Sequence, residues 1–258
     1  MDTERQTIGL IGTGIMGGHM GRRLSSAGFP LLVHSRTREK AGPLLAAGAR
    51  WRDGPGELAA EAEVVLTVVG GPADVEAVLL APGGALERAR PGTVFVDCST
   101  SSPVLARTVA AAAAERGLNA LDAPMTGGEA GAREGRLTFM VGGDRAALER
   151  VRPVLEVLGA RIAYQGPAGS GQRAKLINQA MVAVTLLGVA EGLALADRTG
   201  HDAAALFDAI GSGTASGFIL NAHGRRMLAR DFAPGFYVRH LLKDVELALD
   251  AAREEGLT

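Results

Sequence analysis

The sequence predicts an α/β protein, with a doubly wound sheet in residues 1–165 and an all-helical domain in residues 166–258. In the first part, short apolar or β-branched runs alternate with helical patterns as far as about residue 165. After Gly171 the helical patterns follow one another with no strand signal of similar quality between them. Strands that alternate with helices form right-handed crossovers and a mainly parallel sheet, whereas consecutive helices pack into a unit of their own.

The predicted strands are continuous apolar runs, which are typical of strands buried on both faces of a sheet. Helical patterns separate them: Met16, Met20 and Leu24 recur at four-residue spacing, and an alanine-rich stretch covers residues 104–115. The strand runs are 7–11, 31–34, 64–69, 93–98, 118–123, 138–141 and 161–164.

The helical domain begins with one long linking helix over residues 171–200, after a Gly/Pro turn at 165–171. Further helices are predicted at 202–210 and 238–255. The most apolar segment, 180–196, contains Glu191, and the chain has no purely apolar run of the ~18 residues typical of a membrane span. We therefore expect a buried helix there, with no membrane partner. Because this helix is so apolar, we also expect a second subunit to cover much of it in a homodimer or homotetramer.

Composition excludes several functional classes. The formal net charge is −1 with a pI near 6.5, and the basic residues are dispersed, so we expect no nucleic-acid partner.

The single cysteine, Cys98, cannot form an internal disulfide, and no leader pattern precedes the first strand, which favours the cytoplasm. Five histidines are scattered without ligand spacing, so no metal site is expected. Cys98 follows a strand and is interpreted as a packing residue.

A glycine fingerprint, Gly12-Thr13-Gly14-Ile15-Met16-Gly17, lies between the first strand run and a helical pattern. The pattern is weak by itself in a glycine-rich chain, but here it lies inside a β-α-β unit. In that setting the backbone N–H groups and the helix N-terminus receive the pyrophosphate of a dinucleotide. The fingerprint predicts a Rossmann-type NAD(P)-binding domain; an ordinary tight turn is the alternative.

The residues after the second strand indicate which dinucleotide is preferred. An acidic residue there would bind the ribose hydroxyls of NAD, but this chain has Ser35, Arg36 and Thr37. An arginine can hold the 2′-phosphate that a carboxylate would repel. NADP is therefore the predicted cofactor, with NAD still possible and a solvated basic turn as the alternative.

Two further segments can carry chemistry. Lys175 and Asn178 lie three residues apart, on one face of the long helix, where an ammonium and an amide can converge on one small ligand. Thr126, Gly127 and Gly128 can offer backbone N–H groups and a hydroxyl to a carboxylate, since glycine allows close backbone approach. Taken alone, the lysine could be a solvated side chain and the loop an ordinary turn.

In combination these residues resemble the β-hydroxyacid dehydrogenase family, which includes 3-hydroxyisobutyrate dehydrogenase, tartronate semialdehyde reductase and the glyoxylate/succinic semialdehyde reductases. The resemblance covers essentially the whole chain, and its motifs occur in the family's order. They are GLIGTGIMG, HSRTREK, Asp97-Cys98-Ser99-Thr100, Asp122-Ala123-Pro124-Met125-Thr126-Gly127-Gly128, GSGQRAKLINQ, and Phe236 with LLKDVELAL.

The resemblance implies an NAD(P)-dependent oxidoreductase that interconverts a small 3-hydroxy acid and its semialdehyde. Lys175 would be the general acid in reduction and the general base in oxidation, with Asn178 orienting it or the substrate. The implied substrate is a small carboxylate-bearing aldehyde or hydroxy acid, bound by Thr126, Gly127, Gly128, Lys175 and Asn178. The implied cofactor contacts are Gly12, Gly14, Ile15, Met16, Gly17, Ser35, Arg36, Thr37, Val69, Thr100, Phe236 and Lys243.

The chain also departs from the family pattern. Thr126 replaces a usual serine, and Gly70-Gly71-Pro72 replaces a leucine-proline-asparagine type of turn near the cofactor. Family members usually continue with further helix beyond the position of Thr258, so we expect a helical domain that is truncated relative to the family. One alternative is an imine reductase, which usually lacks the lysine at position 175. Another is a non-catalytic dinucleotide-binding protein.

Overall fold

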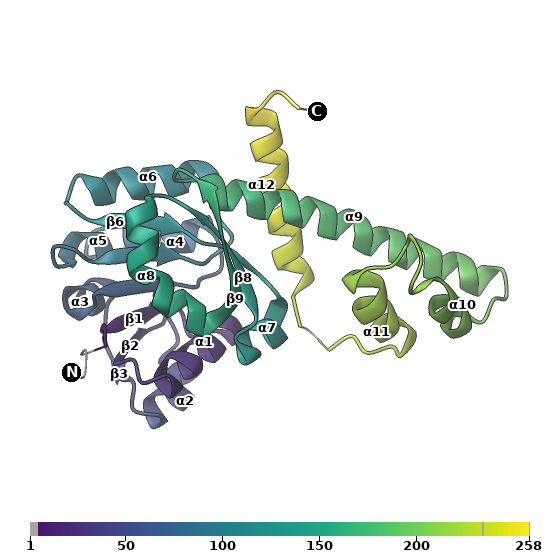
Figure 1. The fold of residues 1–258 in the computed structure, drawn as a ribbon, viewed down its shortest axis with the longest axis horizontal. Helices are drawn as coiled ribbons and strands as arrows, with labels where there is room; N and C mark the ends of the chain where they lie inside the picture. The colour runs from purple at the N-terminus through teal and green to yellow at the C-terminus, as the bar shows by residue number, and fades with distance from the viewer. Residues whose placement is uncertain (1–4, 234, 258) are drawn as a thin grey trace. The chain divides into compact units, whose positions relative to one another are not determined.

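The computed structural model describes residues 5–233 and 235–257, and its sheet has the predicted doubly wound architecture (Figure 1). All the predicted strand runs are strands, and two strands of two residues each, β3 and β7, were not predicted. The strands are β1 (Ile8–Ile11), β2 (Leu31–His34), β3 (Arg50–Trp51), β4 (Val64–Thr67), β5 (Val94–Asp97), β6 (Asn119–Asp122), β7 (Met125–Thr126), β8 (Leu137–Gly142) and β9 (Gly159–Gly166).

The sheet is mainly parallel, in the order β3-β2-β1-β4-β5-β6-β8-β7, with β9 paired to β8. Only the pairings of β8 with β6 and β7 are antiparallel among the described strands. Strand β1 lies between β2 and β4, so the chain adds strands first on one side of β1 and then on the other. Dinucleotides bind at such a switch point, beyond the carboxyl ends of the strands.

Helices cover both faces of this sheet because successive residues of a strand point to opposite sides. In β5, Val94 and Val96 join one buried cluster with α1 and α8, while Phe95 joins the other with α3, α4, α5 and α6. The helices before the linking helix are α1 (Ile15–Ser26), η1 (Arg38–Ala41), α2 (Gly42–Ala46), α3 (Pro55–Glu61), α4 (Pro72–Leu79), α5 (Ala85–Arg88), α6 (Pro103–Ala114), α7 (Gly128–Glu134) and α8 (Arg145–Leu158).

The chain divides into two compact units. The first runs up to Leu176 and includes residues 249–257, and the second is Ile177–Ala248. The remaining helices are α9 (Ser170–Arg198), α10 (Ala203–Ile210), the π-helical turn η2 (Ile219–Gly224), α11 (Arg225–Leu228) and α12 (Val238–Glu254). The segment 219–228 was not predicted. A small apolar core in the second unit contains Ala196, Phe207 and Leu220.

The expectation that residues 180–196 form a buried helix is wrong for the single chain. Met181, Val184, Leu187 and Leu195 are each more than 60% exposed, and Ala196 is the one buried residue of the segment. The second unit is too small to cover both sides of a helix of 29 residues. The apolar composition of the segment predicted a helix correctly, but it did not show whether the chain itself covers that helix.

By length and composition, α9 is the one helix in the described part of the chain that could cross a membrane, with a mean hydropathy of 1.7 in its most apolar window. This is a weak indication, because helices at the core or interface of soluble proteins have the same composition. The first turns of α9 carry Gln172 and Lys175, which are buried and hydrogen-bonded within the first unit.

Candidate active site

The glycine fingerprint has the geometry that a dinucleotide requires. Gly12 has φ +97°, and a side chain there would collide with the carbonyl oxygen of Val68. A side chain at Gly17 would collide with the carbonyl oxygen of Gly12, so this glycine allows α1 to pack closely on β1. At Gly14, by contrast, no heavy atom from elsewhere in the described chain lies within 4 Å of where a Cβ would stand. Gly14 caps α1 without a side-chain hydrogen bond, which leaves an open cradle for a pyrophosphate.

The segment after β2 lies against this cradle. The backbone N–H of Thr13 points at Ser35 Oγ at 3.5 Å, so the two loops touch. Arg36 has 87% of its side chain exposed, and its Nη1 lies 3.2 Å from Oδ1 of Asp74 in α4. Thr37 is half-buried and lies at the N-cap position of η1 without a side-chain capping hydrogen bond. The structure thus brings Ser35, Arg36 and Thr37 next to the fingerprint, and it adds a carboxylate, Asp74, that the sequence reasoning missed.

The loops after β4 and β5 are joined by a serine. The backbone N–H of Val69 donates to Ser99 Oγ at 3.0 Å, and the backbone N–H of Ser99 donates to Asp97 Oδ1 at 3.0 Å. Val69 and Thr100, both predicted cofactor contacts, are half-buried at the carboxyl edge of the sheet. Ser99 therefore connects the loop after β4 to the loop after β5 at the candidate cofactor site.

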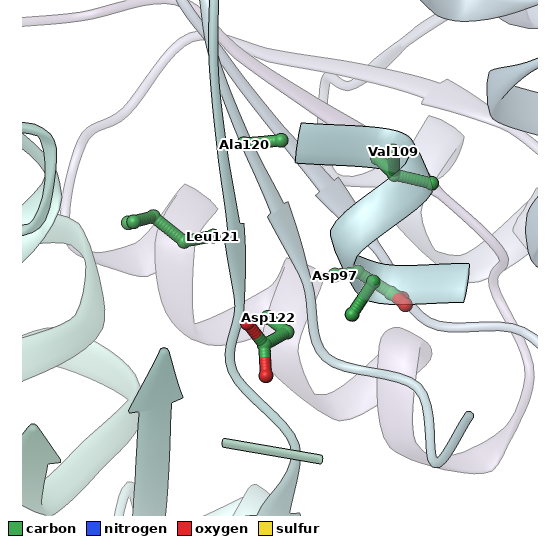
Figure 2. Close-up of a pocket in the computed structure, with 6 residues that line it drawn as sticks. Asp97, Val109, Ala120, Leu121 and Asp122 are labelled. Atoms are coloured by element: carbon green, nitrogen blue, oxygen red, sulfur yellow. The ribbon is translucent and has the colours of Figure 1, made fainter. Parts of the chain in front are cut away.

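Asp122, at the end of β6, anchors the start of the helix that carries Lys175. Figure 2 shows Asp122 beside Asp97, its register partner at the end of β5. Asp122 Oδ1 accepts the N–H of Gly169 and Oδ2 that of Gln172, both at 2.8 Å. Burial raises the pKa of Asp122 above its ordinary value, and the backbone N–H groups that it accepts oppose this shift. Gly169, with φ +89°, turns the chain so that its N–H faces the carboxylate.

Gln172 makes a second connection between α9 and the sheet. Its side chain is fully buried; Nε2 donates to the carbonyl of Ser99 at 2.8 Å, and Oε1 accepts the N–H of Ser101 at 2.9 Å. In the sequence, Gln172 is visible only as part of the GSGQRAKLINQ motif. A buried amide with both ends satisfied fixes the first turn of α9 against the loop after β5.

Lys175 and the predicted substrate loop meet in the structure. Lys175 is 8% exposed, and its Nζ donates to the carbonyl of Met125 at 2.9 Å. Met125 directly precedes Thr126, which pairs with Thr138 in the β7–β8 ladder. Gly127 and Gly128 follow with φ values of +124° and +63°, and both are exposed. The ammonium is therefore held beside the residues that lead into an exposed glycine loop.

The other predicted site residues belong to the second unit. Asn178 follows Lys175 by three residues on α9, and its Nδ2 donates to Gln179 Oε1 at 2.8 Å. Within this unit Gln179 Nε2 donates to Asp244 Oδ2 at 2.6 Å, and Lys243 Nζ forms an ion pair with Asp244 Oδ1 at 3.0 Å. Phe236 is 54% exposed, with its ring 6.0 Å from that of His240.

Other features of the first unit fit structural roles. A cavity of about 10 Å³ beside Asp97, Val109 and Asp122 has room for about one water molecule, so it is too small for a substrate (Figure 2). Cys98 is buried. Its burial and, to a smaller extent, the nearby charge of Asp97 raise the pKa of its thiol, which suits a packing residue rather than a nucleophile. Within the described ranges, no three His, Cys, Asp or Glu residues cluster as metal ligands.

Family models match almost the whole chain. Residues 7–166 match the NAD-binding domain of 6-phosphogluconate dehydrogenase. Residues 169–258 match the NAD-binding domain of NADP-dependent 3-hydroxyisobutyrate dehydrogenase.

Individual relatives agree with these models. The chain is 44% identical over 252 residues to the uncharacterized oxidoreductase YkwC of Bacillus subtilis, covering 98% of this chain and 88% of the relative. It is 39% identical over 250 residues to 2-hydroxy-3-oxopropionate reductase of Escherichia coli, covering 97% and 85%. The structure of Mycobacterium tuberculosis 3-hydroxyisobutyrate dehydrogenase with L-serine is similar with a TM-score of 0.88 and 36% identity, over 98% of this chain and 89% of that one.

Proposed function

Because the chain belongs to the β-hydroxyacid dehydrogenase family, we propose that it interconverts a small 3-hydroxy acid and the matching semialdehyde, with NADP as the preferred cofactor. Members of this family are NAD(P)-binding oxidoreductases. The observation that carries the proposal is the hydrogen bond from Lys175 Nζ to the carbonyl of Met125. It holds a proton donor next to the loop that we assign to the substrate carboxylate.

The chain's own residues would bind the cofactor and manage the proton. Gly12, Gly14 and Gly17 would form the pyrophosphate cradle, with Ile15 and Met16 in the first turn of α1, and Arg36 would hold the 2′-phosphate. A bound nicotinamide would supply or take up the hydride. In reduction, Lys175 transfers a proton from Nζ to the carbonyl oxygen of the substrate, so that hydride and proton together give the alcohol. In oxidation, neutral Lys175 removes the proton from the hydroxyl. Asn178 orients the substrate or Lys175.

The substrate class follows from the loop after β7. Thr126 can donate a hydroxyl hydrogen bond, and the exposed amides of Gly127 and Gly128 can donate to a carboxylate. The names of two relatives support this class. L-Serine, which accompanies the mycobacterial enzyme, and 2-hydroxy-3-oxopropionate both have a carboxylate and an oxygen function at the third carbon.

The preference for NADP rests on Arg36, which stands where NAD-specific sites have an acidic residue. The match of residues 169–258 to a family described as NADP-dependent supports the same choice. Ser35 and Thr37, on either side of Arg36, would add hydroxyl contacts to the 2′-phosphate.

A substrate screen tests this function. The purified protein is given NADPH with succinic, methylmalonic and tartronic semialdehydes and with glyoxylate, and cofactor oxidation is followed by absorbance. The matched controls are aldehydes of equal chain length that lack the carboxylate. We expect turnover of at least one semialdehyde and much slower turnover of its uncharged counterpart. Turnover of a cyclic imine in place of every semialdehyde would contradict the proposal.

A further inference from the structure

The ion pair between Arg36 and Asp74 crosses the switch point of the sheet. Arg36 lies two residues after the end of β2, and Asp74 lies in the first turn of α4, beyond the end of β4. Strand β1, with the glycine fingerprint at its end, lies between β2 and β4. The pair therefore joins the two loops that flank the cradle, at the ribose end of the predicted cofactor site.

Asp74 uses the same guanidinium that a 2′-phosphate would need. The two charged atoms are 3.2 Å apart, with 87% of the Arg36 side chain and 39% of the Asp74 side chain exposed. An exposed pair of this kind is weak enough to break, so Arg36 stays available to a ligand. A phosphate that approaches Arg36 must nevertheless displace the carboxylate or accept its repulsion.

The glycine turn before α4 makes this arrangement possible. A Cβ at Gly70 would stand 2.5 Å from Oδ2 of Asp74, with no other side chain so close. The backbone of Gly70 is not in the left-handed region, so alanine could be placed there without backbone strain. Gly70 is one of the residues that replace the family's leucine-proline-asparagine type of turn. The departure from the family pattern thus gives the Asp74 carboxylate the space that it occupies beside Arg36.

We propose that Asp74 is a specificity-determining residue, which competes with the 2′-phosphate of NADP for Arg36 and so limits the preference for NADP over NAD. The inference rests on the proposed cofactor, but not on the proposed substrate. It is tested by titrating NADPH and NADH into the substrate-free protein and following nicotinamide fluorescence, so that a failure to find a substrate leaves the test intact.

The first variant is Asp74→Asn, which removes the charge and keeps the size. We expect NADPH binding to tighten by about two- to fivefold, the range for one exposed ion pair, while NADH binding is unchanged. The gain should shrink at high ionic strength, since the competing charges are exposed to solvent. The matched control is Glu149→Gln, which removes one negative charge from another exposed pair, with Arg152. Its neighbour Arg150 donates to the carbonyl of Gly92, just before β5. Glu149 therefore lies near the amino ends of the parallel strands, whereas the proposed cofactor site lies at their carboxyl ends.

Two further variants separate competition from general charge repulsion. Arg36→Ala should weaken NADPH by about ten- to a hundredfold, as for loss of a charge-assisted phosphate contact. In that background Asp74→Asn should have no effect on the ratio of NADPH to NADH affinity. Gly70→Ala should displace the carboxylate without deleting it, and so tighten NADPH binding in the otherwise unchanged protein but not in the Asp74→Asn background.

Three results would overturn the proposal. They are an unchanged affinity ratio in Asp74→Asn, an equal gain in Glu149→Gln, and a full effect of Asp74→Asn when Arg36 is already alanine. Melting temperatures of all variants, measured alongside, confirm that each titration reports folded protein.

Discussion

The carboxylate of Asp122 accepts the backbone N–H of Gly169 at 2.8 Å, and its second oxygen accepts that of Gln172, so the end of β6 caps the start of α9. Three residues after Gln172, Lys175 donates to Met125, which follows β6 in the chain. The strand, the substrate loop and the helix that carries the proton donor are thus joined by one short set of buried hydrogen bonds. The position of the Lys175 ammonium depends on Asp122, although Asp122 is not proposed to touch the substrate.

Asp122→Ala should lower both stability and turnover. Two buried N–H groups lose their acceptor, which costs about 1–3 kcal/mol in the free energy of unfolding. The first turn of α9 should then shift, and kcat should fall at least tenfold. The control is Asp144→Ala, which removes the cap of α8, where Asp144 accepts the N–H of Ala147 at 2.7 Å. That variant should lose about 1 kcal/mol and keep its kcat. An equal loss of stability with normal kcat in both variants would show that Asp122 has no positioning role.

The raised pKa of Asp122 predicts a pH dependence of stability. Because the folded protein binds this proton more tightly than the unfolded chain does, the contribution of Asp122 is complete below the ordinary aspartate pKa of about 3.9 and is lost as the pH rises through the raised folded pKa. Chemical denaturation of the wild type and of Asp122→Asn across this range measures the effect. The difference in unfolding free energy should move in favour of the Asn variant as the pH rises. A difference that is constant with pH, or moves the other way, would contradict the assignment.

Thr126→Ala should separate binding from chemistry. The Thr126 hydroxyl is proposed to hold the substrate carboxylate in the ground state and the transition state alike, so its loss should raise KM more than it lowers kcat. Thr126→Ser, which has the family's usual residue, should restore KM. Steady-state kinetics on the best semialdehyde measure both constants. A fall in kcat with unchanged KM would mean that the hydroxyl acts in the chemical step instead.

The exposed side chains of α9 predict an oligomer. Met181, Val184 and Leu187 recur at three-residue spacing and are 67%, 71% and 61% exposed in the single chain. We propose that a second copy of the chain covers them in a dimer or tetramer, because clustered apolar side chains of this size rarely face water. Light scattering at micromolar concentration should give a multiple of the 26.5 kDa chain mass, and Val184→Glu should reduce it. A stable monomer would count against the proposal.

Strong local patterns predicted most of the sheet, and the exceptions have physical reasons. Strands such as β5 are short runs of buried β-branched and aromatic residues, a composition that is typical of a strand in the middle of a sheet. Strands β3 and β7 have two residues each, too few to show any periodicity, and they exist because a neighbouring strand is there to pair with. The segment 219–228 was missed because its apolar residues follow no regular helical spacing, and its structure includes a π-helical turn.

The candidate site was predictable where a residue's chemistry is visible in the chain. The pair Lys175 and Asn178 and the loop Thr126-Gly127-Gly128 each combine residue types at a spacing that is uncommon in sequences. The supporting roles of Gln172 and Asp74 were not visible, because each depends on a partner distant in sequence: Ser99 for Gln172, and Arg36 for Asp74. A polar residue in a helix looks the same in sequence whether it faces solvent or a buried carbonyl.

The central claim is that Lys175 supplies the proton, and Lys175→Met tests it most directly because methionine keeps the length of the buried side chain. NADPH binding and the melting temperature are measured first, to show that the variant is folded and that its cofactor cradle, formed by residues near the start of the chain, is intact. NADPH binding should stay close to that of the wild type, and the melting temperature should fall modestly, because the Met125 carbonyl loses a buried donor at a cost of about 1–3 kcal/mol. Single-turnover reduction of the best semialdehyde should then slow by at least the 10²- to 10⁴-fold that general acid catalysis contributes. A variant that binds NADPH normally and keeps a near-normal rate would contradict the claim.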